Sequence, residues 1–316
     1  MTKRTAFFAL AFILFLSPLA MASQFQLRTP HSELKLKQMP EKIAVYDLAL
    51  LDTFNALNID ADIIPDFNYE GRLAHYDDAK YIKAGSLSEP DFQTLKKLDP
   101  DLIFIGPKAS VQTEAFTQIA PTVFMPNDTQ HFLDNLAVHT QSLAQAFHRE
   151  ELAQQKLKTI QQQHQILQAK TQHQSALMLY AVSDHFIPQA EHDRFGFVYD
   201  LTGLASVVTE TATWKHRHHP ASLNNTEAIS RLKQSDKALR KALKLEPDYI
   251  FVLDRGAVNT QKYASKDAFI KNKLLANARA FKNNKVIYLD ADTWYSIGAG
   301  LGNTEQMLNE LIDKIQ

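Results

Sequence analysis

The feature that most limits the fold is a stretch without glycine or proline, from about Gln130 to Gln174. Leu, Ala, Phe and Ile recur in it at steps of three and four residues, which is the spacing of an amphipathic helix. The pattern predicts a single helix of about 40 residues, about 60 Å long. Such a helix can run along the back of two lobes and restrict their hinge motion. Because sustained heptads are missing, a coiled coil is disfavoured.

Short apolar runs alternate with helical patterns on both sides of this stretch. Before it, the predicted strands are 42–47, 59–67, 81–85, 102–106 and 121–125, and the predicted helices are 48–59 and 90–98. After it, SALMLYAV (175–182) begins a second run of the same kind. Alternating helices and buried strands are typical of largely parallel sheets. We therefore predict an α/β protein of two lobes, 23–128 and 175–316, joined by the helix at 129–174.

A weak internal repeat links the two lobes. LKKLDPDLIFIGPK (95–108) is echoed by LRKALKLEPDYIFVLDR (239–255), each reading as a helix, an acidic-Pro-Asp turn and a buried strand followed by a cation. Open α/β sheets bind ligands at the carboxyl ends of their strands. We therefore expect a cleft between the lobes, with Lys108 and Arg255 near its opposite walls.

The N-terminus has the composition of a secretory signal. Positive charge in MTKR precedes a short apolar stretch, and Ala20-Met21-Ala22 fits a small-x-small cleavage site. We interpret 1–22 as a cleaved signal peptide, the alternative being a retained membrane anchor. The chain has no cysteine, which excludes disulfides, thiolate metal sites and lipid attachment at a Cys. We expect a free periplasmic monomer, and the net charge of −1 disfavours nucleic-acid binding.

Three segments of the second half carry a family resemblance. DRFGFVYDLTGL (193–204), EPDYIFVLDR (246–255) and KVIYLDADTWYSIGAGL (285–301) resemble periplasmic siderophore-binding proteins of iron ABC transporters, closest to the enterobactin- and catecholate-binding subgroup. The resemblance implies a class III periplasmic binding protein fold with a single long inter-lobe helix. It also implies a protein that is no enzyme and has no intrinsic cofactor. Such a protein captures a ferric siderophore and delivers it to an inner-membrane ABC permease.

The resemblance also implies which cations contact the ligand. In this subgroup an Arg in an RFG segment and an Arg that closes an FVLDR strand bind the siderophore, and here they are Arg194 and Arg255. The first lobe departs from the family pattern, because GPKAS (106–110) stands where the family often has GRQ. Lys108 would then supply the missing positive charge. Arg suits a ferric catecholate because its planar group can stack on an aromatic ring while it donates hydrogen bonds.

Two protein ligands to iron follow from the same resemblance. The Tyr of the WYxxGxGL segment is Tyr295, and a His lies in the loop before the helix start NTEAI (225–229). In the loop sequence WKHRHH (214–219), the family spacing favours His219, with His218 next. A siderophore with four donor atoms leaves two iron positions, which a phenolate and an imidazole can complete. The glycines after Tyr295 suggest a flexible loop, while WKHRHH could equally be a solvated basic loop without a ligand.

Other functions remain open at this point. A zinc or manganese importer subunit could use the His residues of 216–219 with Asp200 or Asp290, although two Arg nearby would repel a bare cation. A haem- or cobalamin-binding protein of the same fold is a nearer alternative, since Tyr and His both ligate iron. No GxSxG, HExxH or P-loop motif occurs, so catalysis is disfavoured.

Overall fold

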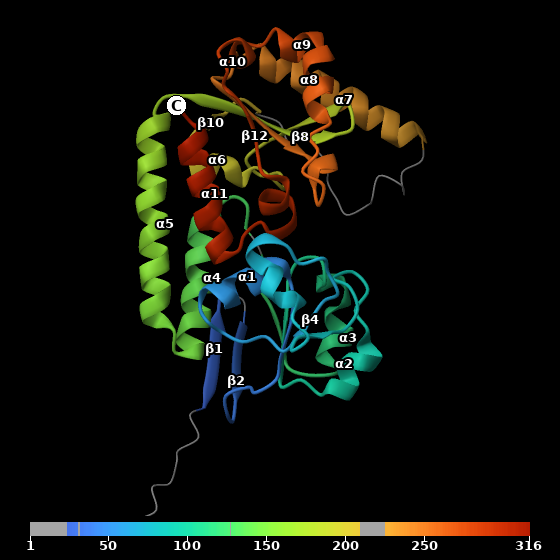
Figure 1. The fold of residues 1–316 in the computed structure, drawn as a ribbon, viewed down its shortest axis with the longest axis vertical. Coiled ribbons are helices and arrows are strands. Elements are labelled where there is room, and N and C mark those ends of the chain that lie inside the picture. Colours follow the sequence, from blue (N-terminus) through green and yellow to red (C-terminus); the bar gives the residue numbers. More distant parts are fainter. Residues whose placement is uncertain (1–23, 31, 127, 209–224) are drawn as a thin grey trace, which may run out of the picture.

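The N-terminal lobe is built on a five-stranded parallel sheet. A computed structural model describes residues 24–30, 32–126, 128–208 and 225–316, and this lobe lies in the lower half of Figure 1. The sheet has the order β5-β4-β3-β6-β7, with every pairing parallel. Its central strands are fully buried because helices cover both faces. The elements are β3 (Ile43–Tyr46), α1 (Leu48–Ala56), β4 (Ile63–Ile64), the 3-10 helix η1 (Gly71–Asp77), β5 (Ile82–Lys83), α2 (Phe92–Leu98), β6 (Leu102–Ile105), η2 (Ser110–Gln112), α3 (Thr113–Thr117) and β7 (Thr122–Phe124).

The C-terminal lobe repeats this plan. Strands β8 and β11 form the centre of a sheet with the order β10-β8-β11-β12, all parallel, while β9 pairs antiparallel with β8. The predicted two-lobe α/β architecture is therefore confirmed. The elements are β8 (Ser175–Val182), β9 (His185–Gln189), α6 (Phe197–Thr202), β10 (Ala205–Ser206), α7 (Asn225–Leu243), β11 (Tyr249–Asp254), η4 (Arg255–Ala257), α8 (Ser265–Lys271), α9 (Lys273–Ala276), α10 (Arg279–Lys282), β12 (Val286–Tyr288), the π-helix η5 (Asp292–Ile297) and α11 (Leu301–Lys314).

The internal repeat in the sequence corresponds to equivalent positions in the two sheets. Asp101 precedes β6 and its carboxylate accepts a hydrogen bond from Lys42 N at 2.8 Å. Asp248 precedes β11 and accepts one from Ser175 N at 2.9 Å. In each lobe this Asp therefore aligns the start of the buried strand with its neighbour. The repeat brings the cation that follows each strand to the same edge of its sheet.

The prediction of one continuous connecting helix was wrong. Two helices occupy the stretch, α4 (Phe132–Phe147) and α5 (Glu150–Thr171), and they pack side by side as a hairpin (Figure 1). The chain reverses at His148, whose φ is 56°, and Ala144 O accepts hydrogen bonds from both His148 N and Arg149 N. A left-handed residue at this position ends a helix. The break escaped prediction because His occupies a position that is more often Gly.

The bottom of the hairpin is anchored to the N-terminal lobe. Arg149 Nε donates to Asn58 O at 3.2 Å, just beyond the end of α1. On the other side, β1 (Phe25–Thr29) pairs with β2 (Ser32–Leu36), and this two-stranded sheet packs against α4. Phe25 meets Phe147 edge to face at 5.2 Å between ring centroids. The hairpin is thus part of the N-terminal lobe at its turn and reaches the C-terminal lobe at its open end.

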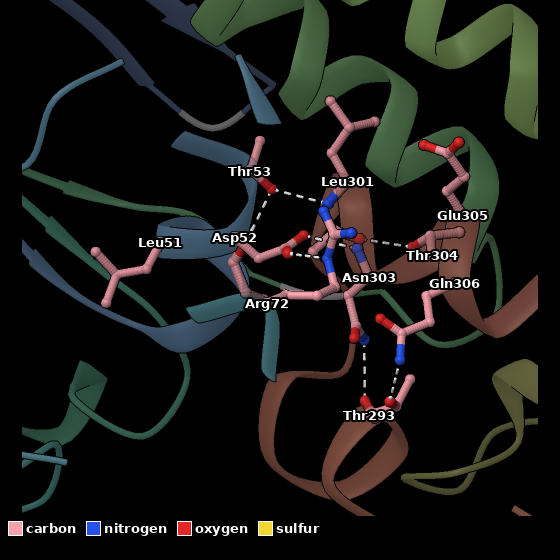
Figure 2. A network of polar contacts seen from close by, with 12 residues as sticks. Leu51, Asp52, Thr53, Arg72, Thr293, Leu301, Asn303, Thr304, Glu305 and Gln306 are labelled. Carbon is pink, nitrogen blue, oxygen red and sulfur yellow. Dashed lines mark hydrogen bonds and ion pairs between the residues drawn. The ribbon is translucent and has the colours of Figure 1, made fainter. Parts of the chain in front are cut away.

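The lobes share apolar and polar contacts. α11 of the C-terminal lobe packs against both α5 and α1, and one continuous core cluster includes buried residues of both lobes, among them Phe54, Leu167 and Leu308. Each lobe also caps a helix of the opposite side. Asp52 on α1 accepts a hydrogen bond from Asn303 N of α11 at 2.8 Å (Figure 2), and Asp200 on α6 accepts one from Leu133 N of α4 at 3.1 Å. These shared contacts support the expectation of limited hinge motion.

Candidate functional site

A pocket of about 380 Å³ opens between the two lobes. Its N-terminal wall comes from the carboxyl ends of β3 and β6, and its C-terminal wall from the start of α6 and from the π-helix η5. This is where parallel sheets place their ligand sites. The lining residues are Asp47, Leu48, Leu87, Pro107, Lys108, Thr129, Phe132, Arg194, Phe195, Phe197, Trp294, Tyr295, Ser296, Ile297, Gly298 and Ala299.

Tyr295 lies on the π-helical turn and not on the flexible loop expected from the nearby glycines. Gly298 N donates to Thr293 O at 3.0 Å, which closes the turn, and Gly298 adopts a φ of 65° to leave it. The neighbouring Trp294 is buried, and its Nε1 donates to Glu310 at 2.8 Å. π-Helical turns often occur at functional sites. The turn holds the half-buried Tyr295 ring at the pocket while Trp294 anchors its base.

Arg194 and Arg255 both lie over the Tyr295 ring. Their guanidinium carbons are 4.4 Å and 4.6 Å from the ring centroid, and Arg194 also donates to the Tyr295 carbonyl at 3.4 Å. Both cations are exposed to solvent. The structure therefore brings together the two Arg and the Tyr that the sequence predicted as site residues.

Two short turns hold the backbone at Arg194 and Arg255 in place. Asp193 accepts a hydrogen bond from Ala190 N at 2.8 Å, which closes the turn that presents Arg194. Asp254 accepts from Gly256 N at 2.8 Å and from Ser265 N at 2.9 Å, which holds the 3-10 turn of Arg255. The aspartate before each Arg is engaged with backbone amides. Each guanidinium is therefore free to act on Tyr295 or on a ligand.

The two cations change the acidity of Tyr295. Burial by itself would raise the pKa of the phenol, but the charges of Arg194 and Arg255, with hydrogen bonds from Arg194 and Tyr180, outweigh burial and lower the pKa of Tyr295 below its ordinary value. Tyr180 responds in the opposite direction. Burial and the adjacent Tyr295 raise the pKa of Tyr180. The pair thus contains one phenol that ionises more readily than a free tyrosine and one that ionises less readily.

Tyr180 was not predicted from the sequence. It lies on β8, with its ring stacked on Tyr295 at 6.2 Å between centroids and an interplanar angle of 11°. Phe195 completes the cluster at 5.0 Å from Tyr180. In the sequence Tyr180 is simply one residue of a buried strand. Its position near the carboxyl end of a central strand was the only available signal.

Lys108 and Asp47 face the pocket from the N-terminal lobe. Desolvation by the pocket walls, followed by the positive charge of Arg194, lowers the pKa of Lys108. Burial raises the pKa of Asp47 to about 6, against opposing effects of the Leu50 amide and Lys108. Asp47 caps α1 by accepting from Leu50 N at 3.0 Å. Lys108 thus adds a third positive charge at the pocket, as the sequence suggested.

An aromatic stack forms the floor of the pocket and joins the lobes. Phe132 at the start of α4 stacks on Phe197 of α6 at 4.7 Å, and Phe197 stacks on Trp294 at 5.3 Å, with interplanar angles of 14° and 9°. All three rings line the pocket and are almost fully buried, so they form a packed apolar part of its wall. The sequence pattern could not predict this stack, because the three rings come from distant segments of the chain.

The predicted histidine ligands lie outside the described residues. His216, His218 and His219 all fall within 209–224, although α7 begins at Asn225 as expected. Within the described ranges, no group of three His, Asp or Glu side chains is placed to hold a metal ion. Asp290 accepts from Thr293 N at 2.8 Å, and Asp200 caps α4. These two aspartates therefore have structural partners in the described part of the chain.

Comparison with known proteins identifies the family. A family model described as a periplasmic binding protein matches residues 43–293. The chain belongs to the periplasmic binding protein family. Proteins of this family bind solutes for transport and do not convert them, so no catalytic reaction is assigned to the pocket. Within the described residues, no helix combines the length and apolar character needed to cross a bilayer.

Individual members of the family resemble this protein over most of its length. The petrobactin-binding protein YclQ of Bacillus subtilis is 30% identical over 289 residues, covering 89% of this chain and 84% of that protein. Its crystal structure superimposes with a TM-score of 0.77, covering 93% and 99% of the two chains at 26% identity.

Two Vibrio proteins are similar as well. The ferric-anguibactin-binding protein FatB of Vibrio anguillarum is 28% identical over 293 residues, covering 89% of this chain and 84% of that protein. The catecholate-siderophore binding protein VctP of Vibrio cholerae has a TM-score of 0.73 at 27% identity, covering 91% and 99%. These comparisons confirm the class III binding-protein fold.

Proposed function

We propose that this periplasmic binding protein captures a ferric siderophore and delivers it to an ABC permease of the inner membrane. The ligand we infer is a catecholate with four donor atoms. One observation carries the proposal: Tyr295, with a lowered pKa, lies beneath Arg194 and Arg255 at the edge of the inter-lobe pocket.

The coordination chemistry of ferric iron supports this assignment. Fe³⁺ is a hard cation that prefers anionic oxygen donors, and an ionised phenol is such a donor. A chelator with four donor atoms leaves two positions open for the protein. Tyr295 would supply one of them. A His of the segment before α7 would supply the other, with His219 as first choice and His218 as the next.

The charge and shape of the pocket suit an aromatic anion. Arg194, Arg255 and Lys108 place three positive charges near Tyr295. Their proximity is reflected in the pKa of Lys108, which desolvation and then the charges of Arg194 and Arg255 lower and Tyr295 raises. Catecholate complexes of Fe³⁺ are anionic, so these cations would stabilise them. The guanidinium groups can also stack on catechol rings. Phe132 and Phe197 add an apolar part to the pocket wall.

The named ligands of the relatives favour an iron chelate over bare zinc, manganese or haem. YclQ is named for petrobactin, FatB for ferric anguibactin and VctP for catecholate siderophores. Three cations beside the phenol also fit an anionic complex better than a free metal cation. The three relatives bind different chelators by name, so the denticity has to be measured.

Titration with two ferric chelates tests the proposal. Purified protein receives the ferric complex of a bis-catecholate, which has open iron positions, or of a tris-catecholate, which has none. We expect the bis-catecholate complex to shift its visible charge-transfer band on binding, and Tyr295→Phe to abolish that shift. The tris-catecholate band should stay in place in both proteins. Absence of binding to either chelate, or an unchanged shift in the Phe variant, would disprove the assignment.

Tryptophan fluorescence gives a second measurement. Trp294 lines the pocket, so a bound ferric complex should quench it. Trp214→Phe leaves Trp294 as the only tryptophan of the chain, since the sequence contains two. Strong quenching in this variant by the ferric complex, and weak quenching by the iron-free chelator, is the expected result.

A further inference from the structure

The start of α11 is capped by residues of the opposite lobe. The first amides of a helix lack partners within the helix and need acceptors from elsewhere. Thr53 Oγ1 accepts from Leu301 N at 3.1 Å, and Asp52 accepts from Asn303 N at 2.8 Å (Figure 2). Both acceptors are on α1 of the N-terminal lobe. A carboxylate is also favoured at this position by the helix dipole.

Asp52 is itself held in place. It is fully buried, and its other oxygen accepts from Arg72 Nε at 2.9 Å. Two glycines allow the close approach of the lobes. A Cβ on Gly300 would collide with the Asp52 carboxylate, and a Cβ on Gly302 would collide with the Arg72 guanidinium. The contact is therefore built for one arrangement of α1 against α11.

Asn303 connects this cap to the turn that carries Tyr295. Its side-chain amide donates to Thr293 O at 2.9 Å and to Gly298 O at 2.7 Å, so it bridges both ends of the π-helical turn. Gln306 adds a hydrogen bond to the Thr293 hydroxyl at 3.1 Å. Figure 2 shows these contacts extending from the α1 side to Thr293. Tyr295 lies between the two bridged carbonyls in the sequence.

We propose that Asp52 and Asn303 are positioning residues for Tyr295. Asp52 fixes the start of α11 relative to the N-terminal lobe, and Asn303 passes that position to the turn that holds the phenol beneath Arg194 and Arg255. The importance of this positioning for iron binding rests on the proposed function, but the placement of Tyr295 can be measured without any ligand. Outer contacts of this kind orient metal ligands and change metal affinity by roughly tenfold or more when removed.

The two main variants nearly preserve side-chain size. Asp52→Asn removes the charge from the cap, and Asn303→Leu removes both donors. Asp248→Asn is the matched control, because Asp248 also pairs with an Arg and accepts a hydrogen bond from a backbone amide, at the opposite end of the C-terminal sheet. Gln306→Ala, at an exposed position, is a milder variant in case Asn303→Leu does not fold.

The first readout is the ionisation of Tyr295 in ligand-free protein. Ultraviolet absorbance is followed against pH for each variant and for the same variant with Tyr295→Phe, and the difference isolates Tyr295. We expect the pKa of Tyr295 to rise in the Asp52, Asn303 and Gln306 variants, because the phenol moves away from the two cations. Asp248→Asn should leave it unchanged.

The second readout is affinity. Asp52→Asn and Asn303→Leu should weaken binding of the ferric bis-catecholate by roughly tenfold and leave the ferric tris-catecholate almost unaffected. The positioning role is overturned if these variants lose thermal stability as Asp248→Asn does while the Tyr295 titration stays at its wild-type position. If the titration shifts but wild-type protein binds no ferric chelate, the positioning role stands and the proposed function fails.

Discussion

The guanidinium carbon of Arg194 lies 4.4 Å from the centre of the Tyr295 ring, although the two residues are 101 positions apart in the sequence. Arg255 lies at 4.6 Å from the same centre. Without a ligand, the two cations therefore have an aromatic partner that becomes negative when it ionises. A ferric catecholate is also aromatic and negatively charged, so it can contact the same two cations as Tyr295.

Removal of either cation should weaken binding of an anionic ferric complex. Arg194→Met and Arg255→Met each lose a charge-assisted contact, and we expect affinity to fall by about 10- to 100-fold, more at low salt than at high salt. The pKa of Tyr295 should rise in both variants, because the positive charge that favours the phenolate is reduced. Fluorescence titration and tyrosine absorbance measure the two effects.

Arg279→Met is the control for these variants. It removes the same positive charge from an ion pair with Asp248 at 2.6 Å, remote from the pocket. Affinity should remain at the wild-type level. An equal loss in this control would mean that net charge, and not the position of Arg194 and Arg255, determines binding.

Affinity for the ferric bis-catecholate should fall as the pH is lowered. Iron must displace the Tyr295 proton once the pH lies below the pKa of that group, so one proton is released per ligand bound. Protonation of a coordinating His near neutrality would add a second proton. Isothermal titration in buffers of different ionisation enthalpy counts the released protons. Tyr295→Phe should reduce the count by one, and an unchanged count would exclude phenolate ligation.

Asp47→Asn should stabilise the protein at neutral pH. The pKa of Asp47 is raised to about 6 in the folded state, so its favourable contribution is present at low pH and is lost as the pH rises toward 6. Asn keeps the helix cap, and we expect the variant to gain about 1–2 kcal/mol at pH 7 and almost nothing at pH 4. Chemical denaturation at both pH values measures the difference.

The cap of α2 provides the opposite case. Hydrogen bonds from Thr94 lower the pKa of Asp91, so its contribution is present at neutral pH and lost in acid. Asp91→Asn should therefore destabilise the protein at pH 7 and have no effect at low pH. The same sign for both caps would contradict the assigned environments.

His148→Gly should stabilise the protein by about 1 kcal/mol, because Gly adopts the left-handed conformation at φ 56° without a steric cost. Thermal denaturation measures this gain. Gln141→Gly, at an exposed position inside α4, should cost about 1 kcal/mol instead. A loss of stability in both variants would show that His148 has a packing role that outweighs its backbone conformation.

The sequence was most informative where burial determines local structure. The fully buried strand Ile43–Tyr46 appears as a continuous apolar run, and Tyr249–Asp254 does so up to its final Asp. Acidic-Pro-Asp turns mark the starts of β6 and β11. The break at His148 left no such mark, because its cause is one backbone dihedral angle.

Contacts between distant segments could not be predicted. The sequence named Arg194, Arg255 and Tyr295 by resemblance, but the stacking of Tyr180 on Tyr295 depends on how β8 meets η5 in space. The cap of α11 by Asp52 likewise joins residues 251 positions apart. Hydrophobic periodicity carries no information on such pairs.

The helical hairpin has a mechanical consequence for transport. The 22 residues of α5 form a strut of about 33 Å that extends from the base of one lobe to the sheet of the other. A membrane transporter that grips both lobes would meet nearly the same span in the loaded and the empty protein. It would therefore have to sense cargo from the surface around the pocket mouth and not from the width of the molecule.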